Sequence, residues 1–126
     1  MRRVALTFAL FLAGCSVSPY AGEDEDDFRI PIVCLPEHEQ LPCAAGVDRS
    51  EEYRFNLQTH CGIEWAYFDG RYWVPPSSVR PPSDWAAITT GTMTLQDRDA
   101  AVFNGPSGPD VPFIPAPAGY EPSPCA

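Results

Sequence analysis

Cysteine and histidine are the residues of this chain best able to do chemistry. The cysteines are Cys15, Cys34, Cys43, Cys61 and Cys125, and the histidines are His38 and His60. Zinc ligands are typically spaced as C-x-x-C or H-x-x-x-H, and neither spacing occurs. His60 and Cys61 are adjacent, so in a strand their side chains point to opposite faces and do not form a base–nucleophile pair. The sequence therefore predicts disulfides, with no metal site and no cofactor.

The segment before Cys15 has the pattern of a secretory signal. Arg2 and Arg3 give it a positive start, and residues 4–12 form an apolar stretch too short to span a bilayer as a helix. Leu12-Ala13-Gly14-Cys15 then resembles the lipobox of bacterial lipoproteins.

That resemblance implies that residues 1–14 are a signal peptide and that Cys15 receives a diacylglyceryl group. Because a single acyl chain binds a membrane only marginally, the two or three chains of a lipoprotein make a stable anchor. The expected location is the extracytoplasmic face of the cell membrane, or the outer membrane in a Gram-negative source. The alternative is an ordinary signal peptide cut near Ala21, which removes Cys15.

Composition limits what the mature chain does. Removing residues 1–14 from the 126 leaves 112 residues, enough for one compact domain. Seventeen acidic residues against the six remaining arginines give a net charge of −11. Such a charge argues against binding nucleic acid, whose phosphates require a basic face.

Two regions are expected after the signal. Residues 15–27 combine the lipidated cysteine with a flexible tether, since the acidic run at 23–27 repels itself and has little to bury. That run lacks the spaced ligands and glycine of a calcium loop. Residues 28–126 are expected to form a single β domain with a proline-rich C-terminal tail.

Four cysteines remain once Cys15 is assigned to the lipid, an even number typical of an exported, disulfide-stabilised domain. Four cysteines allow three pairings, so the sequence alone leaves the connectivity open. We predict that Cys34 pairs with Cys43 across a loop, and that Cys61 pairs with Cys125 to tie down the tail.

Short runs of alternating apolar residues, separated by turns, predict β-structure from residue 28 onward. Asp69-Gly70 supplies the two positive-φ residues of a tight hairpin. The expected strands cover residues 28–35, 53–58, 63–67, 71–74, 92–95, 100–103 and 111–114, with loops at 36–50, 75–84 and 105–110 and a tail over 115–126. Helical periodicity is missing from the mature sequence. The predicted fold is all-β, a small antiparallel barrel or sandwich of about six to seven short strands stapled by disulfides.

The predicted hairpin divides its side chains between two faces. We expect the core face to carry Ile63, Trp65, Tyr67, Tyr72 and Val74. The opposite face carries Glu64, Ala66, Phe68, Arg71 and Trp73, a mixed set that leaves Trp73 available to solvent.

Several motifs give the mature chain a wider resemblance. They are Thr59-His60-Cys61-Gly62-Ile63, Phe68-Asp69-Gly70-Arg71-Tyr72-Trp73, Gly91-Thr92-Met93-Thr94-Leu95, Ala101-Val102-Phe103 and Cys125. With them, residues 53–125 resemble small secreted or lipid-anchored domains of actinobacteria that have no assigned activity. The shared residues are structural, so the resemblance implies no particular chemistry.

The candidate binding surface is aromatic. Tyr72, Trp73 and Trp85, near the loop of residues 75–84, are expected to form a shallow platform for a sugar or a proline-rich peptide. The alternative is that Trp65, Trp73 and Trp85 fill a small core that needs large side chains.

The competing hypothesis is a small envelope hydrolase that cleaves a glycan with paired carboxylates. The candidates are Glu64, Asp69, Asp84, Asp97 and Asp99. Most of them fall at turns, where aspartate is common for conformational reasons, and no catalytic motif accompanies them. The sequence therefore favours a binding or structural module over an enzyme. Its expected partners are the membrane, through Cys15, and an envelope glycan or protein.

Overall fold

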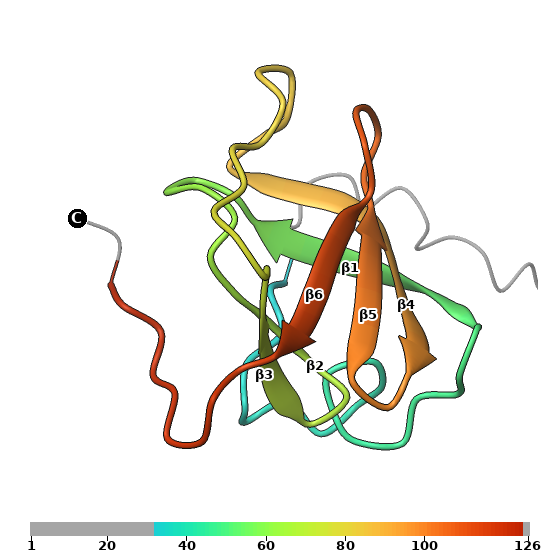
Figure 1. Ribbon diagram of the computed structural model, residues 1–126. Coiled ribbons are helices and arrows are strands. Elements are labelled where there is room, and N and C mark those ends of the chain that lie inside the picture. The colour runs from blue at the N-terminus through green and yellow to red at the C-terminus, as the bar shows by residue number, and fades with distance from the viewer. Residues whose placement is uncertain (1–31, 125–126) are drawn as a thin grey trace, which may run out of the picture. The chain divides into compact units, whose positions relative to one another are not determined.

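The computed structural model of the chain describes residues 32–124, which form six strands and no helix. The strands are β1 Glu52–Gln58, β2 Ala66–Phe68, β3 Arg71–Val74, β4 Ile88–Asp97, β5 Ala100–Asn104 and β6 Val111–Pro115. All neighbours are antiparallel, in the order β1-β4-β5-β6-β3-β2. The sheet curls into a nearly closed barrel (Figure 1), so the all-β prediction is confirmed.

Two local predictions explain much of this topology. Asp69 and Gly70 adopt φ values of 54° and 71° and join β2 to β3 in the predicted hairpin. The strands predicted at residues 92–95, 100–103 and 111–114 correspond to β4, β5 and β6, which pair in sequence as a three-stranded meander.

Strand β4 is the longest because it serves two sides of the barrel. It pairs with β1 over residues 88–94 and with β5 over residues 92–97. Gly91 lies in this strand, and a Cβ there would stand 2.2 Å from the carbonyl oxygen of Asn104 and 2.7 Å from the Phe103 ring. A glycine is therefore required where β4 crosses so close to β5.

The seam between the edge strands β1 and β2 is filled by side chains and a loop. Inside, the Phe68 ring meets the Phe55 ring edge-on, with 5.8 Å between centroids. Outside, the loop of residues 32–51 is tied to the hairpin turn. The Asp69 carboxylate accepts hydrogen bonds from the backbone N–H groups of Gly46 (2.8 Å) and Val47 (3.2 Å).

The same loop contains the Cys34–Cys43 disulfide, which is the predicted near pair. This loop occupies part of the region predicted as a strand. Residues 32–35 of the expected strand at 28–35 are not part of any strand, and residues 28–31 lie outside the described residues. The reason is local: His38 turns the chain by accepting a hydrogen bond from the Leu35 N–H on Nδ1 (3.0 Å) and donating its own N–H to the Leu35 carbonyl (3.0 Å).

The core shows that the assignment of the hairpin faces was wrong. Ala66, Phe68 and Trp73 point inward, whereas Trp65, Tyr67, Tyr72 and Val74 are half-buried on the outside. Ile63 is buried as predicted, but it lies before β2 and bridges to Val79. The alternation counted from Ile63 therefore does not continue into the hairpin. The core consists of Cys34, Phe55, Leu57, Ile63, Ala66, Phe68, Trp73, Met93, Leu95, Ala101, Phe103, Val111 and Phe113.

Candidate functional site

Trp73 and Trp85 do not form the predicted exposed platform. Trp73 has an exposed fraction of 0% and donates its indole N–H to the Phe68 carbonyl at 2.8 Å. Trp85 is half-buried and donates its indole N–H to Ser107, while its ring packs edge-on against Phe103 with centroids 5.7 Å apart. Both tryptophans therefore serve packing, as the alternative interpretation holds, and only Tyr72 of the predicted set lies on an open aromatic surface.

That surface, here called the aromatic face, consists of Trp65, Tyr67, Tyr72 and Tyr120. Tyr72 on β3 is its centre. The ring centroids of Trp65, Tyr67 and Tyr120 lie 5.8, 5.0 and 5.6 Å from that of Tyr72, all in edge-to-face contacts. All four side chains are half-buried. Such contacts stabilise each pair by about 0.5–1.5 kcal/mol beyond the burial of area, so the cluster holds its shape.

Sequence reasoning missed Tyr120, because it follows β6 in the proline-rich tail. Two backbone hydrogen bonds bring it to the cluster. The Ala116 N–H donates to the Tyr72 carbonyl at 3.0 Å, and the Tyr120 N–H donates to the Pro117 carbonyl at 3.0 Å. The tail leaves the sheet beside β3 (Figure 1). The Pro-Ala-Pro-Ala-Gly-Tyr sequence was the available signal, since a turn there folds the tyrosine back.

A hollow of about 440 Å³ lies between the hairpin and the tail. Its lining comes from both: Pro36, Tyr67, Gly70, Arg71, Tyr72, Pro115, Ala116, Pro117, Gly119 and Tyr120. None of these side chains is a carboxylate or an amide. The hollow is therefore a small aromatic and proline-lined site with hydroxyl groups at its surface.

The polar side-chain atoms of the aromatic face have no hydrogen-bond partner among residues 32–124. Trp73 and Trp85 both donate their indole N–H groups to protein atoms. Across residues 32–124, no hydrogen bond engages the Trp65 indole or the hydroxyls of Tyr67, Tyr72 and Tyr120. These groups are free to bond to water or to a ligand.

Partial burial raises the pKa of the Tyr72 hydroxyl above 10.0, and the nearby Tyr67, Glu37 and Glu121 raise it further. Burial likewise raises the pKa of Tyr120, with smaller contributions from Glu64 and Tyr72. Both hydroxyls are therefore protonated at neutral pH and available as donors.

Most carboxylates proposed for a hydrolase have structural partners. Asp69 holds the loop of residues 32–51. Asp84 accepts a hydrogen bond from the Ser107 hydroxyl at 2.7 Å, and Asp97 accepts one from the Asp99 backbone N–H at 2.8 Å. Asp99 itself lies 3.8 Å from the Arg71 guanidinium. Glu64 is exposed near Tyr120.

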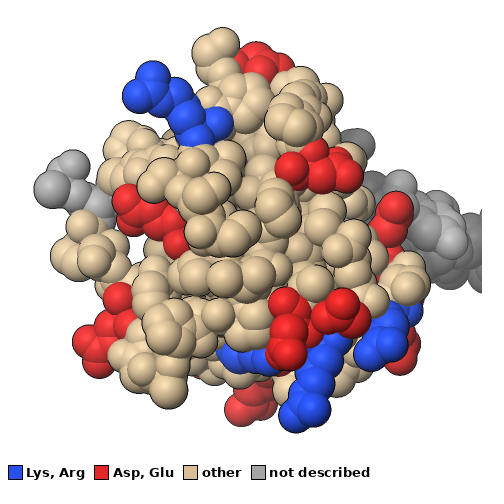
Figure 2. All heavy atoms as spheres, viewed as in Figure 1, with Lys and Arg blue, Asp and Glu red and all other residues tan. Residues whose placement is uncertain are grey.

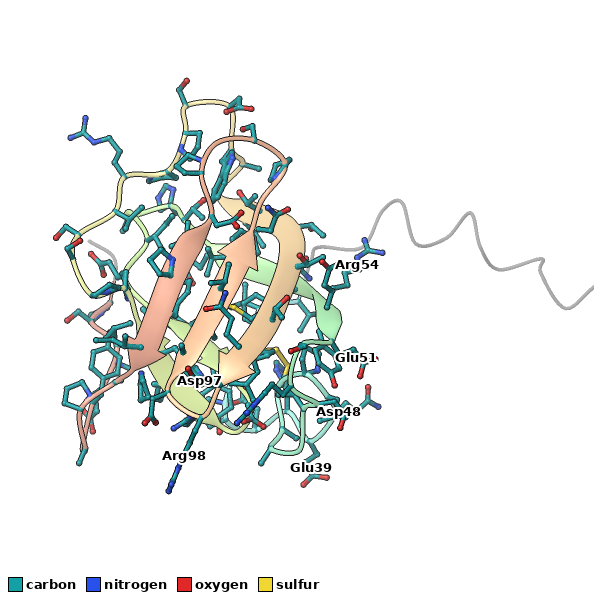
Figure 3. The ribbon with its side chains drawn as sticks, turned by 45° about the vertical axis from the view of Figure 1, so that its right-hand side comes forward. Glu39, Asp48, Glu51, Arg54, Asp97 and Arg98 are labelled. Carbon is teal, nitrogen blue, oxygen red and sulfur yellow. A yellow bond between two sulfur atoms is a disulfide. The ribbon has the colours of Figure 1, made fainter. Side chains whose placement is uncertain are left out.

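The other charged groups do not gather into a site in the views shown. Glu39, Asp48 and Glu51 point to solvent from the loop of residues 32–51. Asp97 lies away from these three carboxylates, at the end of β4 (Figure 3). The face in Figure 2 has a wide uncharged centre with scattered carboxylates around it and no continuous basic patch.

A second hollow, about 570 Å³, lies beside β1 and the loop of residues 32–51, where Ile32 and Leu41 are exposed. Its lining includes Phe55 but neither a tyrosine nor a tryptophan. The aromatic face therefore combines more groups suited to recognition.

The remaining predictions concern the cysteines, the N-terminal segments and a metal site. Cys34 and Cys43 are paired, and Cys61 is also disulfide-bonded. Cys15, the signal peptide of residues 1–14, the tether of residues 15–27 and Cys125 lie outside the described residues. Within residues 32–124, the histidine, cysteine and carboxylate side chains form no cluster of three or more able to hold a metal ion.

Comparison of the chain with protein-family models, curated proteins and solved structures finds no match. In the part of the chain that the structure describes, no helix has the length and apolar character needed to cross a membrane.

Proposed function

We propose that this chain is an extracytoplasmic lipoprotein whose β domain binds a component of the cell envelope through the aromatic face. Cys15 carries the lipid, residues 16–27 are the tether, and the domain binds its target without catalysing a reaction.

The observation that carries the proposal is the outward orientation of Trp65, Tyr67 and Tyr72. Aromatic side chains bury 150–250 Å² each when fully covered, so leaving several half-open forgoes stabilisation that a further layer of protein would supply. Their donors are also unpaired among residues 32–124. Rings combined with free donors are the features with which proteins bind sugars and peptides.

The anchor restricts the possible targets. A lipid on Cys15 and a short acidic tether keep the domain close to the membrane surface, within reach of envelope glycans and proteins. The acidic charge of the mature chain disfavours phosphate-rich partners. An envelope glycan or protein is therefore the expected ligand.

Two experiments test the proposal. The first compares the wild type with Cys15→Ala in detergent-phase partitioning. The wild type is expected in the detergent phase, and the variant is expected to accumulate uncut and without lipid. An unchanged lipid-bearing fraction in the variant would refute the anchor.

The second experiment tests the site with the mature chain carrying Cys15→Ser. Every core side chain lies between Cys34 and Phe113, so loss of the lipid leaves the fold intact. The protein is immobilised and exposed to solubilised envelope material. Tyr72→Ala is expected to lose the captured component, whereas Tyr53→Phe, a matched tyrosine outside the aromatic face, retains it. Equal capture by the two variants, or none by the wild type, would contradict the proposal.

A further inference from the structure

We propose that the aromatic face recognises an extended proline-rich peptide that carries a basic residue. This inference rests on the proposed function and names the ligand class of the same site. Three observations support it: the chain's own proline-rich tail on this face, the hydroxyl donors of the hollow, and the carboxylates at the rim of the hollow.

The chain's own tail shows that the face accepts proline-rich backbone. The segment of residues 115–121 has the sequence Pro-Ala-Pro-Ala-Gly-Tyr-Glu and runs along one side of Tyr72. A single backbone hydrogen bond, from Ala116 to Tyr72, joins it to the hairpin beyond the end of β6. The tail thus forms one wall, and the hairpin the other, of a hollow that a second extended chain fits.

The donors of the site match a chain that lacks donors. Proline has no backbone N–H, so a polyproline II segment presents carbonyl acceptors and ring faces with few groups to donate. The hydroxyls of Tyr67, Tyr72 and Tyr120 are unpaired among residues 32–124, so each is available to donate to such a carbonyl. Aromatic-lined grooves recognise proline-rich peptides in this way.

A saccharide fits the same hollow less well. Sugar hydroxyls are donors as well as acceptors, and buried donors require acceptors. Within the lining, tyrosine hydroxyls are the side-chain acceptors, because it contains no aspartate, glutamate, asparagine or glutamine. The composition of the hollow therefore favours a peptide.

The charges around the hollow specify the peptide further. Glu37 and Glu121 lie close enough to Tyr72, and Glu64 close enough to Tyr120, to raise the pKa of these hydroxyls. All three carboxylates are exposed, and Glu37 and Glu121 directly follow the lining residues Pro36 and Tyr120 in the chain. The only cation in the lining, Arg71, is engaged by the Arg98 carbonyl, Asp99 and the Trp73 ring. An arginine or lysine on the ligand complements this rim.

The test uses synthetic peptides and the mature chain carrying Cys15→Ser. The probe is a ten-residue peptide of alternating alanine and proline with one terminal arginine. Two control peptides replace the arginine by glutamate or every proline by glycine, and an N-acetylglucosamine oligomer represents a glycan. Binding is followed by intrinsic fluorescence and calorimetry.

The arginine peptide is expected to bind about threefold more tightly than the glutamate peptide, as for an exposed ion pair. The glycine peptide lacks the preformed polyproline II helix and the proline rings, so it is expected to bind at least tenfold more weakly. Tyr72→Phe keeps the ring and removes one donor, so it should weaken the arginine peptide about fivefold. Tyr53→Phe should leave binding unchanged.

Two results would overturn the inference. The first is a wild type that does not bind the arginine peptide, and the second is binding that Tyr72→Phe leaves unchanged. If the glycan binds instead, or if envelope capture still depends on Tyr72, the proposed function stands and only the ligand class is wrong. If the wild type also captures no envelope component, both fail.

Discussion

The reversal of the hairpin faces leads to a matched test in which the same substitution is made on each face. Trp73 is fully buried, with its ring centroid 6.4 Å from that of Phe68, and its indole N–H satisfies the Phe68 carbonyl. Truncating a buried tryptophan to alanine costs about 3–5 kcal/mol, because transfer energy is lost and a cavity remains. Trp73→Ala also leaves that buried carbonyl without its donor.

Trp65 lies on the opposite face and is half-buried, with one edge-on contact to Tyr72. Trp65→Ala should therefore cost only about 1 kcal/mol. In urea, with a slope of about 1.5 kcal/mol per M for a domain of this size, the midpoint should fall by about 2–3 M for Trp73→Ala and by less than 1 M for Trp65→Ala.

The assay is equilibrium unfolding in urea, followed by far-ultraviolet circular dichroism because each variant loses a fluorophore. Both proteins are kept oxidised so that the disulfides remain intact. A Trp65→Ala midpoint equal to or lower than that of Trp73→Ala would refute the assignment of the inner face. Destabilisation below 1 kcal/mol by Trp73→Ala would do the same.

Three further predictions concern the loop, the disulfide and the tyrosines. Asp69→Ala removes the acceptor for the Gly46 and Val47 N–H groups and should destabilise the domain by about 2 kcal/mol, with Asp69→Asn recovering part of this, as measured by thermal unfolding. Replacing Cys34 and Cys43 together by serine opens a loop of sequence separation 9 and should cost about 2–3 kcal/mol in urea unfolding; a change below 0.5 kcal/mol would show that the loop is held by its hydrogen bonds alone. Because the pKa values of Tyr72 and Tyr120 are raised in the folded protein, the unfolded chain releases these protons first, so stability should be complete below pH 10 and should fall as pH rises above it. Alkaline unfolding, followed by tyrosinate absorbance, should show a smaller pH dependence of stability in Tyr72→Phe, and an identical dependence would contradict the partial burial of that hydroxyl.

Local signals predicted most of the strands and turns, but not the loop that occupies residues 32–35. Asp69-Gly70 specifies its hairpin because both residues tolerate positive φ, and polar turns at residues 98–99 and 105–110 separate the three strands of the meander. The predicted Cys34–Cys43 pair is also present, although the sequence alone left the connectivity open. The pairing of Cys61 with Cys125 stays a prediction, because Cys125 lies outside the described residues.

Which face of the hairpin becomes the core is not a local property. Both faces carry aromatic residues, so alternation alone does not rank them, and the short β2 does not include Ile63. The choice depends on distant partners. Phe68 is covered by Tyr53 and Phe55 from β1, and the turn next to it is held by the loop of residues 32–51. Tyr120 joins the outer face only because the tail folds back after β6.

The separation of the two faces bears on function as well as stability. Ala66, Phe68 and Trp73 complete the core from inside, so the fold does not require Trp65, Tyr67 and Tyr72 to be fully covered. Substitutions on the aromatic face that keep the ring, such as Tyr72→Phe, should then alter binding with little loss of stability, whereas core substitutions should reduce both. A surface that served only to cover the core would show the opposite, with stability and capture falling together at Tyr72. The Tyr72→Phe variant, which keeps the ring and removes only a solvent-accessible hydroxyl, is therefore the substitution that distinguishes recognition from packing.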